Sequence, residues 1–116
     1  MALGTPKTHE FLIATTATGT SASPTSIRGY EQAEFEVSGM RVSNGSSRLR
    51  VIGSVYGSSF TTLTVTNRIT NTASDSIVTN GIYSLDVGAI GFVNVRVVNF
   101  HPDSTPTCVM QAVNYI

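Results

Sequence analysis

The chain has 116 residues, the size of one compact domain, and its seven basic and seven acidic side chains cancel. Charged residues make up 12% of the chain, which argues against nucleic acid and against a membrane surface as partners, because both are bound by clustered Lys and Arg. With 41% hydrophobic residues, the chain is also too apolar to be disordered.

The residue types favour β-strands over helices. Val, Ile and Thr total 37, against 29 for Ala, Leu, Glu, Lys, Gln, Arg and Met together, and β-branched side chains suit a pleated sheet. No stretch approaches the roughly 20 apolar residues of a membrane-spanning helix. The first eight residues lack the apolar run of a signal peptide, so we expect the chain to fold in a reducing cytoplasm.

Residues 1–32 are predicted to form an extended N-terminal arm or linker. Their one apolar run, Phe11, Leu12 and Ile13, is followed by small and polar residues with no helical period. A loop of this length is unusual inside a compact domain. An arm ordered against a neighbouring subunit and a mobile linker are the alternatives. The apolar run favours the arm, with Phe11, Leu12 and Ile13 as its contact residues.

Residues 33–116 are predicted to form an all-β domain, an antiparallel β-sandwich or jelly roll of about seven or eight strands. Short segments alternate apolar and polar residues, as half-buried strands do, and turn signals separate them. The expected strands are 34–38, 49–56, 60–66, 76–79, 82–87, 92–98 and 107–115.

Two glycine signals in this region predict local geometry. The alternation slips at Ile52-Gly53, which indicates a bulge or a close approach of the backbone. Asn80-Gly81, between two apolar segments, is the strongest hairpin signal in the chain.

Two of the expected strands have a clear inner face. On the first, Tyr83, Leu85 and Val87 share one face and are expected in the core. On the second, the predicted inward residues are Val93, Val95 and Val97, and the predicted outward residues are Asn94 and Arg96.

The residue types capable of catalysis do not form a convincing set. His101, Asp103 and Ser104 carry the groups of a hydrolytic triad, but His-Pro-Asp-Ser is better explained as a turn, in which Pro fixes φ and Asp or Ser binds nearby backbone. Cys108 alternates with apolar residues along an expected strand and is predicted to be a buried hydrophobe rather than a nucleophile. We therefore expect no catalytic residues.

No metal or cofactor is expected. His9 and His101 have no paired spacing, and one cysteine cannot build a zinc site. The acidic residues are scattered, and the glycines never form a phosphate loop that opens a helix.

Two sets of side chains are candidates for contact with a partner or ligand. Arg48 and Arg50 point the same way from one expected strand, with Arg41 nearby in the sequence. This stripe suits a partner's carboxylates, and a charged strand face that keeps the chain soluble is the alternative.

Tyrosines are the other candidates, because carbohydrate sites place aromatic faces beside polar side chains. Tyr30, Tyr56 and Tyr115 are possible members of such a site. Tyr56 is the best of them, since it abuts a hairpin loop, whereas Tyr83 is expected in the core.

One set of motifs runs through three segments, Leu49–Val65, Asn80–Val87 and Phe92–Val97. These segments resemble small β-sandwich modules of tailed-phage virions. Those modules often read as an apolar strand, Gly-Ser, a turn, an aromatic residue and a Thr-rich strand, followed by a Gly-x-Tyr strand and a Val-Arg-Val strand. The resemblance covers about residues 33–100, and Tyr56-Gly57 replaces the usual Asp-Gly of the turn. A similar hairpin occurs in discoidin-like sugar-binding jelly rolls.

The resemblance implies a non-enzymatic structural part of a virion: a capsid decoration (cement) protein, a head knob or a fibre adaptor. Such a protein would bind the major capsid protein or another virion protein through its arm and a sheet edge, as a homo-oligomer with a trimer favoured. The alternative is a carbohydrate- or receptor-binding module of a tail or fibre, and an enzyme is the least supported.

Overall fold

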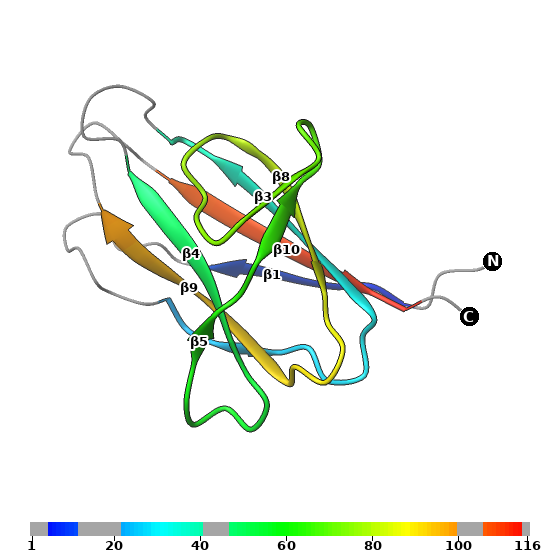
Figure 1. Ribbon diagram of the computed structural model, residues 1–116. Helices are drawn as coiled ribbons and strands as arrows, with labels where there is room; N and C mark the ends of the chain where they lie inside the picture. The colour runs from blue at the N-terminus through cyan, green and yellow to red at the C-terminus, as the bar shows by residue number, and fades with distance from the viewer. Residues whose placement is uncertain (1–4, 12–21, 41–46, 100–105, 115–116) are drawn as a thin grey trace.

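A computed structural model describes residues 5–11, 22–40, 47–99 and 106–114. These residues form two antiparallel sheets packed face to face, and the prediction of an all-β sandwich is confirmed (Figure 1). The described ranges hold no helix with the length and hydropathy needed to cross a bilayer.

The two sheets contain six and four strands. The larger sheet has the order β1 (Lys7–Phe11), β10 (Thr107–Val113), β3 (Gln32–Ser38), β8 (Gly81–Asp86), β6 (Val65–Asn67) and β7 (Thr72–Ser74). The smaller sheet has the order β2 (Thr25–Ser26), β9 (Phe92–Asn99), β4 (Arg48–Ser54) and β5 (Thr61–Thr62).

The core lies between the sheets and follows the period of two that strands impose. Tyr83 and Leu85 on β8 are buried, as are the three valines predicted to face inward on β9. The prediction that Asn94 faces solvent is wrong. Although Arg96 is exposed, Asn94 is 5% exposed, because residue 22 passes over it: the Asn94 amide nitrogen donates to the Ala22 carbonyl at 2.6 Å.

The described parts of the predicted arm lie inside the sandwich, which corrects the domain boundary expected at residue 33. All five residues of β1 pair with β10, and Phe11 is 1% exposed, with its ring 6.1 Å from that of Phe35. The apolar side chain leaves water by packing into its own core, so Phe11 is not presented to another subunit. Leu12 and Ile13 lie outside the described residues.

Two predicted strands are arranged differently from expectation. The segment 60–66 divides into β5 and β6, which belong to different sheets. The hairpin predicted at Asn80-Gly81 is wrong: Ile77 forms a bridge with Leu49, and β8 pairs with β3 and β6 instead. The Asn80 side chain binds another segment instead: its carbonyl oxygen accepts a hydrogen bond from the Met40 amide at 2.8 Å.

The docking of β1 can be tested by truncating its buried side chain. Phe11→Ala should lower the free energy of unfolding by about 3–5 kcal/mol, because it removes a fully buried ring and leaves a cavity. Urea denaturation measures the loss. Thr8→Ala, on the exposed face of the same strand, is the matched control and should change stability by less than about 0.5 kcal/mol. Equal stability of the two variants would contradict the placement of β1.

Candidate functional site

Three connecting segments meet at one end of the sandwich and form its most distinctive surface. They are the β4–β5 loop (residues 55–60), the β8–β9 turn (residues 87–91) and the segment of residues 27–30 (Figure 1, lower end). We call this surface the loop end.

Backbone hydrogen bonds fix the three segments to one another. The Gly91 amide donates to the Ser54 carbonyl at 3.0 Å, and the Gly91 carbonyl accepts from the Ile27 amide at 2.8 Å. Within the β4–β5 loop, the Gly57 amide donates to the Ser54 hydroxyl at 2.8 Å. The Arg28 guanidinium lies 5.8 Å from the centre of the Phe92 ring, which is cation–π geometry. The loop end is therefore held by side-chain and main-chain contacts together.

Two glycines at the loop end are required by close packing. A Cβ at Gly91 would lie 2.5 Å from the Val55 carbonyl oxygen, a backbone atom that cannot move aside. Gly57 has a φ of +87°, and a Cβ there would lie 3.1 Å from the Phe92 ring. These approaches let the loops lie directly against β9.

A hollow of about 470 Å³ opens at the loop end. At Gly53, where the sequence predicts a bulge or a close approach of the backbone, the Leu63 Cδ1 atom lies 2.5 Å from where a Cβ would be, so a side chain packs against this glycine. The irregularity in the pairing of β4 with β9 lies at Arg48 and Leu49 instead. The lining residues are Gly53, Ser54, Val55, Tyr56, Ser58, Ser59, Thr61, Leu63 and Ile90.

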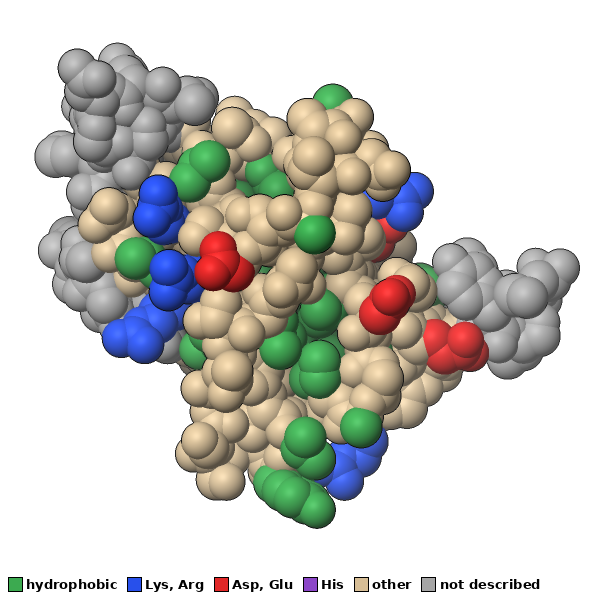
Figure 2. All heavy atoms as spheres, in the orientation of Figure 1, with side chains coloured by type: hydrophobic (Ala, Val, Ile, Leu, Met, Phe, Trp, Pro, Cys, Tyr) green, Lys and Arg blue, Asp and Glu red, His purple; other side chains and the backbone are tan. Residues whose placement is uncertain are grey.

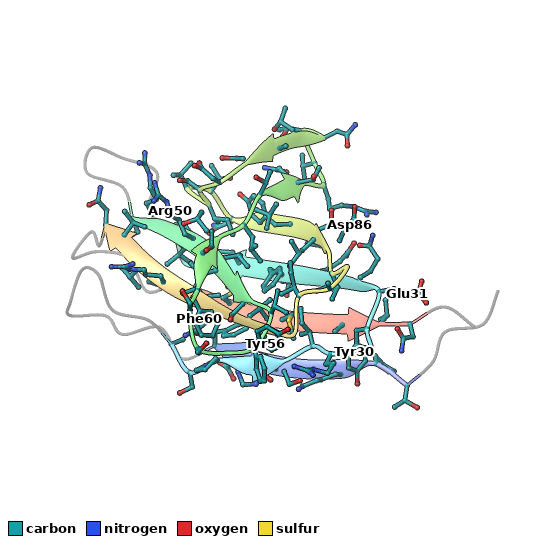
Figure 3. The ribbon with its side chains drawn as sticks, turned by 60° about the horizontal axis from the view of Figure 1, so that its bottom comes forward. Tyr30, Glu31, Arg50, Tyr56, Phe60 and Asp86 are labelled. Carbon is teal, nitrogen blue, oxygen red and sulfur yellow. The ribbon has the colours of Figure 1, made fainter. Side chains whose placement is uncertain are left out.

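Tyr56 stands at the rim of this hollow. It is 83% exposed, and its neighbour Val55 is 49% exposed, so the loop presents apolar surface to solvent. Figure 3 shows Tyr56 and Phe60 at the same end of the sandwich, and Figure 2 shows hydrophobic side chains gathered there beside a basic one. A smaller hollow of about 180 Å³ shares Val55, Tyr56 and Ile90 with the first and includes Arg28 in its lining.

The chemistry of the loop end is that of recognition. An exposed aromatic face, an apolar floor and hydroxyl groups from Ser58, Ser59 and Thr61 can bind a ligand with both apolar and hydroxyl-bearing faces. The sequence identified Tyr56. It did not identify Leu63, which follows β5, or Ile90, in the β8–β9 turn, because these residues come together with Tyr56 only in the fold.

The predicted arginine stripe lies elsewhere, on the outer face of the smaller sheet. Arg48 is exposed and Arg50 is half-buried, while Leu49 between them is buried. Arg96 of β9 is the cross-strand partner of Arg50 and joins the stripe. Sequence reasoning missed this third arginine, since its position depends on the register between β4 and β9. Arg41 lies outside the described residues.

The residues weighed for catalysis are not brought together where they can be described. Cys108 is fully buried, and this burial raises the pKa of its thiol to about 12, which keeps it protonated and unreactive. His9 is half-buried, with its ring 4.7 Å from that of Phe11. The described residues contain no group of three or more His, Cys, Asp or Glu suited to a metal. Residues His101, Asp103, Ser104 and Tyr115 lie outside them.

Comparison with known proteins yields matches in structure alone. No family model and no curated protein matches the sequence. The crystal structure of the SPBc2 prophage-derived protein YomS superposes with a TM-score of 0.74 at 18% identity, over 98% of this chain and 99% of that one. The PBSX exported protein XepA superposes with a TM-score of 0.76 at 12% identity, over 96% of this chain and 39% of that one. The chain therefore shares the fold of phage-derived proteins.

Burial of Cys108 predicts a loss of stability at alkaline pH. Unfolded, the thiol has a pKa near 9.0, so between pH 9 and about 12 the unfolded chain loses a proton that the native chain keeps. Below pH 9 the buried thiol does not change the free energy of unfolding with pH. Above pH 9 the free energy of unfolding falls by up to about 1.4 kcal/mol per pH unit. Cys108→Ala should lack this loss. Urea denaturation of both proteins between about pH 8 and about pH 11 measures the difference between their free energies of unfolding, in which the titration of other groups cancels. If this difference does not change with pH, the thiol is not buried.

Proposed function

We propose that the chain is a non-enzymatic structural protein of a phage particle. More specifically, the chain is a capsid decoration (cement or knob) protein of the virion, bound to the major capsid protein or another virion protein. Its support is the fold, which is shared over nearly the whole chain with a prophage-derived protein, together with the small number of charged groups on a rigid sandwich.

The observation that carries the attachment is the position of β1. This strand comes from the N-terminal segment and is also an edge of the larger sheet, so the two predicted contact elements, arm and sheet edge, are one. Within the described residues β1 pairs on one side, with β10. An edge strand presents main-chain donors and acceptors to which an extended segment of a partner adds as a further strand.

We further propose that the chain assembles as a homotrimer. Closed symmetric assembly multiplies a small contact surface without lengthening the chain, which suits a protein of this size that binds a repeating shell. The mass in solution by light scattering distinguishes a trimer from a monomer or dimer.

Proline substitutions test attachment through β1. Along an antiparallel edge strand, successive amides alternate between facing the paired strand and facing outward. Of Thr8→Pro and His9→Pro, one removes an outward amide, and that variant is identified by its unchanged unfolding in urea. It should fail to co-sediment with shells purified without the chain, whereas the unmodified protein should bind them.

A proline on the other edge of the same sheet is the matched control. Of Thr72→Pro and Ala73→Pro on β7, the variant that unfolds normally should bind shells as the unmodified protein does. Normal decoration by the folded β1 variant would overturn the attachment, and failure of the unmodified protein to bind shells would overturn the decoration function.

A second candidate function is favoured by Tyr56. An aromatic side chain that is 83% exposed, beside a hollow rimmed by serine and threonine hydroxyls, suits a saccharide, which has an apolar C–H face for stacking and hydroxyl groups around its edge. The chain would then be a carbohydrate- or receptor-binding module of a tail or fibre.

A glycan array with the purified protein tests this candidate. Any saccharide bound by the protein should be lost with Tyr56→Ala, because the stacking face is removed, and retained with Tyr56→Phe, which keeps that face. Ile69→Ala, at a site 78% exposed outside the loop end, is the control and should bind normally. Binding that survives Tyr56→Ala would place the saccharide elsewhere.

A further inference from the structure

We propose that Arg48, Arg50 and Arg96 form a docking surface for a carboxylate-rich segment of a partner protein. Arg50 and Arg96 are direct cross-strand partners of β4 and β9, so their side chains leave the same face of the sheet about 5 Å apart at Cβ. Arg48 shares this face, because the buried residues Leu49 and Val51 alternate with the two arginines of β4. Figure 2 shows basic side chains gathered in this part of the molecule with an acidic side chain beside them, and Figure 3 shows Arg50 well apart from Tyr56.

In the described part of the chain, no carboxylate forms an ion pair with these three arginines. The ion pair found there joins Arg68 to Glu34 at 3.1 Å, and it involves none of the three arginines. Asp75 lies two residues before Ile77, which bridges to Leu49, so a carboxylate borders the cluster. Its oxygen accepts from the Ser76 hydroxyl at 3.4 Å and makes no ion pair with an arginine.

The arrangement also lowers the stability of the isolated chain. Like charges placed directly opposite on neighbouring strands repel each other. In addition, Arg50 Nε is buried and has no hydrogen-bond partner, a condition that folded proteins generally avoid. The opposed like charges indicate that a carboxylate from outside the chain binds the accessible nitrogens of these arginines; Arg50 Nε is out of its reach while it is buried.

The geometry of the guanidinium group identifies that acceptor as a carboxylate. An arginine presents parallel N–H donors that match the two oxygens of a carboxylate, and adjacent arginines can hold one carboxylate between them or two in a row. A protein segment is favoured over nucleic acid, because three arginines on a chain with no net charge are too few to neutralise a run of phosphates. This inference does not depend on the attachment through β1.

Binding of a defined acidic peptide tests the proposal. Hexaglutamate, titrated into the full protein at low salt, should shift the NMR signals of the Arg50 and Arg96 side-chain N–H groups, and the affinity should fall as salt is raised. Arg50→Gln and Arg96→Gln should each weaken binding about tenfold or more, the loss expected for a charged hydrogen bond. Arg50→Lys should also weaken it, because the charge remains but the paired donors are lost.

Two controls separate a docking role from a structural one. Arg68→Gln removes the same charge from the surface that holds the ion pair with Glu34 and should bind hexaglutamate as the unmodified protein does. Arg50→Gln should unfold at the same or a higher urea concentration, since it relieves the repulsion. Destabilisation by Arg50→Gln, absence of hexaglutamate binding, or tighter binding of a short DNA duplex by the same arginines would each overturn the proposal.

Discussion

The face-to-face packing of the two sheets is the constraint on which the other features depend. Long strands such as β3, β8 and β10 give one face to the common core, so every second residue in them is committed to packing, whereas the three residues of β7 are all exposed. Leu49 and Val51 occupy inward positions on β4, and Arg48 and Arg50 are directed outward as a consequence. The same alternation buries Cys108, and this burial keeps its thiol protonated. The core thus decides which side chains remain available for recognition.

The available side chains lie on a frame with little freedom to adapt. The loop end is fixed by hydrogen bonds among three segments and by the packing of glycines against neighbouring atoms. The cross-strand register fixes the spacing of Arg50 and Arg96. Lys7 at the start of β1 donates to the Ser26 carbonyl of β2 at 2.5 Å, which joins the edges of the two sheets. Contacts made at one of these surfaces therefore determine the orientation of the others.

Local pattern was sufficient where burial follows from neighbours along the chain. Tyr83, Leu85 and Val87 were identified as core residues because alternation alone specifies a strand face. Contacts between distant segments could not be derived in this way. Asn80-Gly81 has the composition of a hairpin turn, but the bridge of Ile77 to Leu49 takes the preceding residues to the other sheet.

The candidate site residues were likewise predictable from local pattern, whereas their contacts with distant segments were not. Tyr56, Arg48 and Arg50 were found because a residue beside a turn, or two residues apart on a strand, has a predictable exposure. Arg96 was assigned to the outer face but could not be joined to Arg50, since their pairing depends on the register of β9. Phe11 was expected to contact another subunit because apolarity indicates that a side chain is buried without indicating against what.

A fold specified mainly by alternating apolar residues tolerates extensive change at its outer positions, so shared architecture identifies the scaffold and leaves the role to the side chains outside the core. Among those, the arginines differ from Tyr56 in one respect. Tyr56 adds exposed apolar area at a loop, where it puts no strain on the strands, whereas Arg50 and Arg96 repel each other within the central pair of the smaller sheet. Solubility alone would be served by charges of mixed sign spread over the surface. Like charges opposed on neighbouring strands are explained by a partner that supplies the missing carboxylates.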